Sequence, residues 1–199
     1  MPLARQDLMR HLWHMGGGLL PPFFYGFIER PTALVLIFSL TSLVLALDGV
    51  RLQNEKLNRF IQTRIPMLWK EKERSHLTAS TLLLIGCCLT TLLIPDKSIA
   101  RLAMVYLAVG DSAAAITGKT LGRHKLLNGR KSVEGTLGGF LANVAVALLL
   151  GAGQFGLPAS VALAGAFAAS ILEFFPTRVD DNISLPVGCG LLMLLLSHL

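Results

Sequence analysis

The sequence predicts an all-α membrane protein, a polytopic helical bundle of about seven transmembrane helices with one further amphipathic helix at the membrane interface. Two features of composition lead to this fold class: 53% of the 199 residues are hydrophobic and only 15% are charged. Soluble domains carry about 25% charged residues. The third feature is spacing, because a membrane-crossing helix needs about 20 mostly apolar residues, and several such runs follow one another. We expect residues 1–199 to form a single integral-membrane domain.

The apolar runs predict seven membrane spans, at residues 12–28, 32–48, 77–94, 99–117, 134–152, 158–174 and 183–199. One side of the bundle then holds the N-terminus and three polar segments, residues 49–76, 118–133 and 175–182. Of the 18 Lys and Arg residues, all but Arg30, Lys97 and Arg101 fall on that side. Because loops rich in Lys and Arg stay in the cytoplasm, we expect a cytoplasmic N-terminus and a C-terminus on the opposite side. The net charge of +6 follows from this orientation and does not indicate nucleic-acid binding.

The longest of these segments, residues 49–76, contains a helical pattern of its own. Its apolar residues recur at helical spacing, at Leu57, Phe60, Ile61, Ile65 and Leu68. Polar residues fill the positions between them, which is typical of an amphipathic helix lying in the membrane interface. We expect this helix to end near Pro66, with Trp69 at headgroup level. A solvated charged connector accounts for the same residues equally well.

Two pairs of polar residues occur at the cytoplasmic ends of the first two predicted spans. Arg10 and His14 are four residues apart and share one face of a helix, where Arg10 could bind a phosphate group. The residue types alone favour a simpler interpretation, a basic membrane anchor with an interfacial histidine. Asp48 and Arg51 are three residues apart at the end of the second span. A local ion pair at a helix end is the simpler interpretation of that pair.

The stretch from Asp111 to Gly139 gathers acidic, basic and glycine residues between two apolar runs. Within it, Gly118-Lys119-Thr120 is similar to the end of a nucleotide-binding P-loop. That motif needs a glycine at position 113, which is Ala113 here, and it follows a β-strand. The preceding run is a predicted membrane helix, so we reject the P-loop interpretation.

A different anion site is predicted at the start of the next helix. Ser132 can cap that helix, whose free N–H groups and dipole favour an anion. Lys131 and Arg130 add positive charge there, and Gly135 and Gly138 would allow close approach to the backbone. The GxxxG spacing that begins at Gly135 is also typical of helix packing alone.

Carboxylates on the same side of the membrane could hold a cation. Asp111 and Glu134 would supply hard oxygen ligands to Mg²⁺, which commonly uses one or two carboxylates plus the phosphates of a substrate. A structural cluster of salt bridges is the competing interpretation. The adjacent Asp180 and Asp181 repel each other unless a cation or basic group lies near. Together with Asn182 they favour metal or nucleotide binding, although Asp180 or Asn182 could instead only cap the last helix.

With these groups in order along one membrane face, the sequence resembles the CTP-dependent lipid-alcohol kinases: dolichol kinase, phytol kinase and the CTP-type diacylglycerol kinase. The motifs that carry the resemblance are Arg10…His14, Asp48…Arg51, Glu73…Leu77-Thr78, Gly110-Asp111…Gly118…Gly122-Arg123…Lys131-Ser132…Glu134-Gly135 and Glu173…Pro176…Asp180-Asp181-Asn182. Each motif is weak alone, and the five in order are fairly specific. The family usually has Lys after the first Arg, where this chain has His11.

The resemblance implies an integral-membrane kinase domain that transfers the γ-phosphoryl group of CTP, or of another nucleoside triphosphate, to the hydroxyl of a membrane lipid alcohol. The implied cofactors are Mg²⁺ or another divalent cation and CTP, and the implied partners are the nucleotide, the lipid and the membrane. Residues expected to be catalytic are Asp111, Lys131, Glu134 and Asp181. Residues expected to bind the nucleotide are Arg10, His14, Asp48, Arg51, Gly118, Lys119, Arg123, Lys125, Lys131, Ser132, Gly135 and Asn182. Residues expected to bind the metal are Asp111, Glu134, Asp180 and Asp181, and Asp111 could instead accept the proton of the alcohol.

Other functions remain open at this stage. The stretch that begins Gly122-Arg123-His124-Lys125 is also similar to the nucleotide loop of phosphatidate cytidylyltransferases, although the chain lacks the His-Gly-Gly and Asp-Arg-x-Asp signature of those enzymes. A small transporter would need acidic residues near mid-membrane and on both sides. Of the 12 acidic residues, all but Glu29 and Asp96 fall on the predicted cytoplasmic side, which disfavours a transporter. A scaffold protein gives no reason to gather acids beside basic glycine-rich turns.

Overall fold

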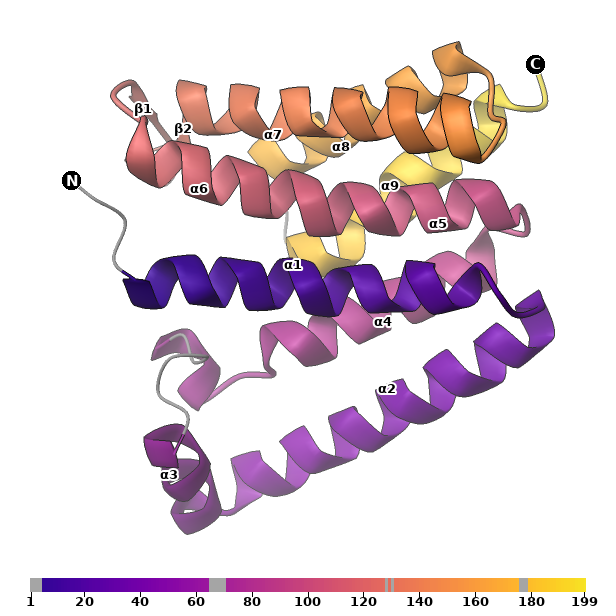
Figure 1. The fold of residues 1–199 in the computed structure, drawn as a ribbon. Helices are drawn as coiled ribbons and strands as arrows, with labels where there is room; N and C mark the ends of the chain where they lie inside the picture. Colours follow the sequence, from indigo (N-terminus) through magenta and orange to yellow (C-terminus); the bar gives the residue numbers. More distant parts are fainter. Residues whose placement is uncertain (1–4, 65–70, 128, 130, 176–178) are drawn as a thin grey trace.

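The structure, a computed structural model, describes residues 5–64, 71–127, 129, 131–175 and 179–199. The described part is almost entirely helical (Figure 1). Its α-helices are α1 (Arg5–Tyr25), α2 (Arg30–Gln53), α3 (Glu55–Arg64), α4 (Ala79–Leu93), α5 (Lys97–Tyr106), α6 (Ser112–Thr120), α7 (Val133–Val146), α8 (Ala159–Phe174) and α9 (Asp181–Leu196). The other elements are a 3₁₀ turn, η2 (Glu71–Arg74), two π-helical segments, η3 (Leu107–Asp111) and η4 (Ala147–Gln154), and two short strands, β1 (Lys125–Leu126) and β2 (Lys131–Ser132). The predicted all-α class is therefore confirmed.

Each of the seven predicted spans coincides with a helical segment. By length and composition, three of the described segments can cross a membrane, namely Arg30–Gln53, Lys97–Thr120 and Val133–Gln154. The apolar helices α4, α8 and α9 are shorter, at 15 or 16 residues. The apolar helices indicate membrane association. The crossing of the membrane by all seven segments, and the side on which each terminus lies, stay predictions.

The continuous helix formed by α5, η3 and α6 lies at the centre of the bundle. The protein buries 67% of its most apolar stretch, against 17% of the corresponding stretch of α2, so α2 is peripheral. Ile99, Leu102 and Tyr106 of α5 are fully buried. The Tyr106 hydroxyl donates a 2.7 Å hydrogen bond to the carbonyl oxygen of Ala162 in α8, which satisfies a polar group that would otherwise be costly to bury.

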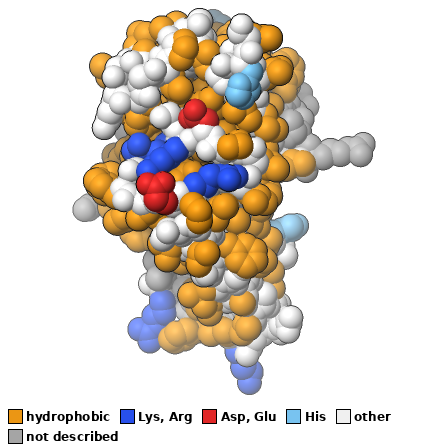
Figure 2. All heavy atoms as spheres, turned by 90° about the vertical axis from the view of Figure 1, so that its right-hand side faces the viewer, with side chains coloured by type: hydrophobic (Ala, Val, Ile, Leu, Met, Phe, Trp, Pro, Cys, Tyr) orange, Lys and Arg blue, Asp and Glu red, His pale blue; other side chains and the backbone are white. Residues whose placement is uncertain are grey.

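The two ends of the bundle differ in their polar groups. In Figure 1 the start of α1, the end of α6, the β1–β2 hairpin and α3 lie at the left, and the end of α9 lies at the right. Figure 2 shows that the right-hand end is mostly hydrophobic, with a group of acidic and basic side chains in the middle of the view and further basic side chains at its lower edge. Arg30 donates to the carbonyl of Thr91 at 3.2 Å and Arg101 to that of Pro22 at 2.9 Å. Backbone carbonyl oxygens thus accept hydrogen bonds from both Arg30 and Arg101.

The predicted amphipathic helix is present as α3, whose described residues are Glu55–Arg64. None of its residues is fully buried, and the Phe60 side chain is 56% exposed. Pro66 and Trp69, which were expected to mark its end and its depth, lie outside the described residues. The position of α3 in the membrane interface stays a prediction.

A buried ion pair anchors the segment between α2 and α4. Asp48 and Arg51 are 5% and 3% exposed, and Arg51 Nε lies 2.8 Å from Asp48 Oδ1. Arg51 also donates to the carbonyl oxygens of Glu73 and His76, at 2.9 and 2.8 Å. Asp48 Oδ2 accepts from the backbone N–H of Thr78, at 2.8 Å. The pair therefore joins the end of α2 to the 3₁₀ turn and to the residues that precede α4.

Replacement of Arg51 by Met should lower the free energy of unfolding by about 3–5 kcal/mol, because Asp48 would keep a buried charge without its main partner. Unfolding in detergent micelles, followed by circular dichroism against increasing denaturant, would measure the change. The matched control is Arg59→Met, since the Arg59–Glu55 pair is 74% and 78% exposed and should contribute about 0.5 kcal/mol or less. Equal losses in the two variants would contradict the anchoring role.

Candidate active site

Two cavities adjoin each other near the start of α1 and the end of α6. We call the first the acidic cavity; its volume is about 380 Å³. Its polar lining comes from four parts of the chain: His14, Glu73, His76, Asp111, Asp180, Asp181 and Asn182. We call the second the basic cavity; its volume is about 320 Å³. Its polar and glycine lining is formed by Asp111, Gly118, Lys119, Lys125, Gly129, Lys131, Ser132, Gly135, Thr136 and Glu173.

Asp111 lines both cavities. It is the last residue of η3, the π-helical segment that interrupts the central helix. A π-bulge shifts the residues after it around the helix, and such segments are frequent at functional sites. Asp111 Oδ2 lies 3.7 Å from His14 Nε2, and the Asp111 side chain is 33% exposed. One carboxylate thus faces a compartment rich in acids on one side and a compartment rich in lysines on the other.

A close helix crossing brings the start of α9 to the acidic cavity. A Cβ atom added to Gly86 of α4 would meet the carbonyl oxygen of Asn182 at 2.0 Å, so only glycine fits there. Asp180 caps α9 by accepting from the backbone N–H of Asn182 at 3.1 Å and from its side-chain amide at 2.7 Å. Asp180 thus has the capping role that was the alternative interpretation of this residue, and it also lines the cavity together with Asp181.

The basic cavity lies where the β1–β2 hairpin joins α7. Antiparallel pairing of Lys125 with Ser132 brings both lysine-bearing strands to one place. Lys131 Nζ lies 3.2 Å from Glu173 Oε1, and that carboxylate comes from the end of α8. Lys125 Nζ lies 3.4 Å from the carbonyl oxygen of Gly118. The three lysines of this cavity come from one short stretch, residues 119–131, whereas Glu173, the partner of Lys131, comes from a distant part of the chain.

The start of α7 lies at the same place, and its first backbone N–H, that of Val133, donates to the carbonyl oxygen of His124 at 3.0 Å. Ser132 Oγ accepts from the N–H of Gly135 at 3.1 Å, so the predicted helix cap is confirmed. Gly138 and Gly139 of α7 serve helix packing. This differs in part from the expectation that Gly135 and Gly138 leave the backbone open to a ligand. A Cβ on Gly138 would meet Thr117 Oγ1 at 2.5 Å, and one on Gly139 would meet the Ala114 Cβ at 2.9 Å. Gly135 faces Gly118 in the same crossing and also lines the basic cavity.

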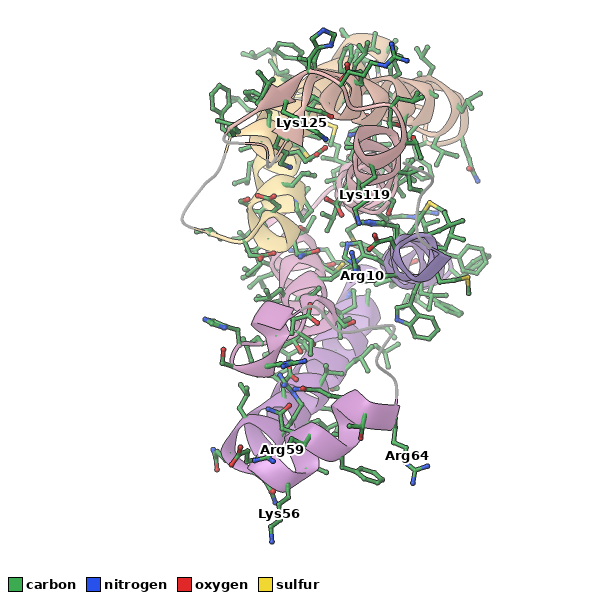
Figure 3. The ribbon with its side chains drawn as sticks, turned by 90° about the vertical axis from the view of Figure 1, so that its left-hand side faces the viewer. Arg10, Lys56, Arg59, Arg64, Lys119 and Lys125 are labelled. Carbon is green, nitrogen blue, oxygen red and sulfur yellow. The ribbon has the colours of Figure 1, made fainter. Side chains whose placement is uncertain are left out.

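A third group of charges lies beside the two cavities, between α1 and α6. Asp7 Oδ1 is 2.9 Å from both Arg10 Nη2 and Lys119 Nζ. The hydrogen bond from Lys119 holds the pKa of Asp7 below its ordinary value. Figure 3 looks at this end of the molecule and shows Arg10, Lys119 and Lys125 in one region, around α1, α6 and the hairpin. In the same view Lys56, Arg59 and Arg64 lie well apart from them, on α3.

The structure leaves several predicted site residues outside the cavities. Asp48 and Arg51, both described, line neither cavity. Their hydrogen bonds instead hold the segment that brings Glu73 and His76 to the acidic cavity.

Glu134 also lines neither cavity, and its Oε1 lies 2.6 Å from His124 Nδ1. Further predicted residues outside both cavities are Arg10, which pairs with Asp7, and the exposed Arg123. Arg130 and Pro176, which belong to the predicted motifs, lie outside the described residues.

Glu73 and His76 line the acidic cavity, although the sequence gives neither a predicted role at the site. Glu73 belongs to one of the motifs that resemble the lipid-alcohol kinases, and this motif is the sequence signal that could have identified Glu73 as a site residue. His76 has no comparable signal, because its place depends on the contact between Arg51 and its carbonyl oxygen. Asp7 is likewise found only through its contact with Lys119.

Hard oxygen atoms in the acidic cavity fit a magnesium–nucleotide ligand better than a bare metal ion. Among the described residues, no three His, Cys, Asp or Glu side chains converge closely enough to hold a metal ion. Asp111, Asp180 and Asp181 nevertheless line one cavity. Mg²⁺ commonly takes one or two carboxylates and completes its shell with phosphate oxygens and water. The donor set therefore suits Mg²⁺ that arrives with a polyphosphate.

Comparison with known proteins gives three findings. A sequence profile described as the cytidylyltransferase family matches residues 8–175. An uncharacterized protein of Rickettsia prowazekii, RP860, is 27% identical over 188 residues, which cover 90% of this chain and 89% of that protein. A phytol kinase of Synechocystis sp. is 36% identical over 98 residues, which cover 47% of this chain and 42% of the kinase.

No solved structure matches the chain significantly. The family profile covers most of the sequence, and its matched region includes Asp111, both strands of the hairpin and Glu173. The partial match to a phytol kinase agrees with the predicted resemblance to lipid-alcohol kinases. The chain thus belongs to the cytidylyltransferase family.

Proposed function

We propose that this protein transfers the γ-phosphoryl group of CTP to the hydroxyl of a membrane lipid alcohol. The observation that carries the proposal is the position of Asp111, which lines both cavities. A basic compartment suits a triphosphate, and an adjoining acidic compartment suits a cation and a nucleophile. The family profile supports the use of CTP, and the similarity to a phytol kinase supports a lipid alcohol as acceptor.

In this mechanism the basic cavity binds the triphosphate. Lys119 and Lys125 would neutralise phosphate oxygens, and the positive end of the α7 dipole would favour the anion. Lys131 would contribute while its partner Glu173 holds it in place at 3.2 Å. Phosphoryl transfer depends chiefly on positioning and on charge neutralisation, and this set of donors provides both.

The acidic cavity binds the acceptor hydroxyl and the cation. Asp111, with Asp180 or Asp181, would hold Mg²⁺, which neutralises the β- and γ-phosphates of the bound nucleotide. In the alternative role, Asp111 would orient the alcohol and accept its proton as the oxygen–phosphorus bond forms and CDP leaves. His14, 3.7 Å from Asp111, lies within reach of that proton through a small rearrangement or a water molecule.

Cytidylyl transfer to a lipid phosphate is the second candidate function. The name of the family favours it, as does the similarity of the loop at Gly122–Leu126 to the nucleotide loop of phosphatidate cytidylyltransferases. Both reactions use CTP at a membrane face, and they differ in which phosphorus atom is attacked. The kinase remains our proposal because a phytol kinase is among the proteins to which the chain is similar.

CTP labelled separately at its α- and γ-phosphorus atoms should distinguish the two reactions. We expect purified protein to move the γ label, and not the α label, into lipid when phytol, a polyprenol or diacylglycerol is supplied. Thin-layer chromatography of the extracted lipid would measure the transfer. Phosphatidic acid serves as the test acceptor for the alternative. Transfer of the α label to it, with none of the γ label to any alcohol, would replace the kinase proposal.

Replacement of Asp111 by Asn should lower kcat by at least about 100-fold, because a general base or a metal-binding carboxylate is lost. The shape of the side chain is kept, so the unfolding temperature should change little. The γ-label assay and circular dichroism would measure the two quantities. Glu55→Gln is the matched control, since Glu55 is 78% exposed on α3 and should leave both unchanged. A variant at position 111 with full activity would rule out either role.

Replacement of Lys125 by Ala should raise the KM for CTP by about tenfold or more, since hydrogen bonds to a charged group contribute about 1.5–3 kcal/mol. Lys125 is a sharper test than Lys131, whose removal would also leave the buried Glu173 without its cation. The control is Lys56→Ala, because Figure 3 shows Lys56 on α3, away from Lys125. If the KM for CTP in the Lys125 variant equals that of the wild type, the assignment of the basic cavity to the triphosphate is wrong.

A further inference from the structure

An apolar groove runs between α1 and α4 on the side of the bundle next to the acidic cavity. Its volume is about 480 Å³. Its walls are formed mainly by Trp13, Gly16, Gly17 and Leu20 of α1 and by Leu83 and Leu84 of α4. Trp13 and Leu20 are 63% and 54% exposed, so the groove opens at the outer surface of the helices. In a membrane protein such a surface faces lipid tails.

The groove and the acidic cavity meet at His14, which lines both. His14 in turn lies 3.7 Å from Asp111, and Asp111 lines the acidic and basic cavities. Shared residues thus connect an apolar groove, an acidic cavity and a basic cavity in that order. A molecule with an apolar tail and a hydroxyl group matches the first two compartments in sequence.

Two adjacent glycines leave this groove open without being needed for helix packing. A Cβ atom added to Gly16 or Gly17 would meet nothing within 4 Å. The next residue, Gly18, differs, because its Cβ would lie 2.9 Å from the Cβ of Ala108. Glycine inside a helix costs about 1 kcal/mol relative to alanine. Gly16 and Gly17 therefore weaken α1, and what they provide in return is space along the groove.

We propose that the α1–α4 groove holds the hydrocarbon tail of the lipid alcohol, with its hydroxyl group beside His14 at the mouth of the acidic cavity. This inference rests on the proposed kinase function. The tail would enter sideways from the bilayer, so the alcohol need not leave the membrane. Trp13 suits the mouth of such a groove, because tryptophan is enriched where apolar and polar layers of a membrane meet.

The groove should act by orientation more than by affinity. A tail that moves from lipid into a protein groove gains little from the hydrophobic effect, because both surroundings are apolar. Its contacts with α1 and α4 would fix the direction from which the hydroxyl approaches the phosphoryl group. Small errors in such positioning lower rates strongly, by as much as about 100-fold for 1 Å.

A second apolar groove, between α7 and α8, is the main rival for the tail. Its volume is about 390 Å³, and Phe140, Phe167 and Phe174 form part of its walls. It meets the basic cavity at Thr136. A tail bound there would bring its hydroxyl into the basic cavity, the space assigned to the triphosphate, so the α1–α4 groove fits the proposed reaction better.

Replacement of Gly17 by Leu should fill the groove. For a long polyprenol we expect kcat/KM to fall by at least about tenfold, because the tail no longer lies in its track. For a prenol of about ten carbons the loss should be much smaller, and the KM for CTP should stay at the wild-type value. Gly49→Leu is the matched control. A Cβ atom added to Gly49 of α2 would also meet nothing within 4 Å, and Gly49 lines none of these cavities. An unchanged ratio of long-chain to short-chain kcat/KM in the Gly17 variant would overturn the inference.

Photo-crosslinking of the wild-type protein gives a readout that needs no variant. A long-chain alcohol that carries a diazirine in its tail should label peptides of α1 and α4, and unlabelled alcohol should compete. Labelling confined to α7 and α8 would overturn the inference, as would labelling of α1 and α4 that excess unlabelled alcohol does not reduce. Failure of the proposed function would be seen separately, as a wild-type protein that moves no γ label to any alcohol.

Discussion

Helix crossings that only glycine permits determine where the polar groups of this protein can meet. Gly86 of α4 touches the carbonyl oxygen of Asn182, and Gly118 of α6 touches Gly135 of α7. The first crossing positions the start of α9 at the acidic cavity, and the second positions the hairpin and the capped start of α7 at the basic cavity. Larger side chains at these positions would separate the helices and, with them, the two cavities. The site is thus a consequence of backbone contact between helices that are distant in sequence.

The acidic and basic cavities share the side chain of Asp111. Asp111 faces both, while Glu173 and Asp7 each hold a lysine of the basic side. Such pairing lets several cations lie close together without mutual repulsion until a polyphosphate competes for them. The arrangement suits attack at phosphorus in general. Kinase and cytidylyltransferase chemistry could therefore share this architecture and differ in how far the nucleotide extends toward Asp111.

Most of the features that could be predicted from the sequence depend on local patterns of residues. Apolar runs located the helical segments, and Ser132 and Asp180 cap helices as their residue types indicate. Properties that depend on distant contacts were less accessible. Nothing near Glu134 in the sequence signals that its carboxylate pairs with His124. The burial of Asp48 and Arg51, which makes them an anchor, depends on hydrogen bonds to residues 22 and 25 positions away from Arg51.

The short lengths of α4 and α9 would have a consequence for the membrane around them, given the predicted crossing of the bilayer by both helices. At 15 and 16 residues they are about 22–24 Å long, whereas the hydrocarbon layer of a bilayer is about 30 Å thick. The central segment Lys97–Thr120, of 24 residues, has no such deficit. A bilayer meets short apolar helices by thinning locally, and the first residues of α4 and α9 line the acidic cavity. The headgroup layer would dip at that point, so that water and a dissolved nucleotide reach a depth at which a lipid hydroxyl already resides.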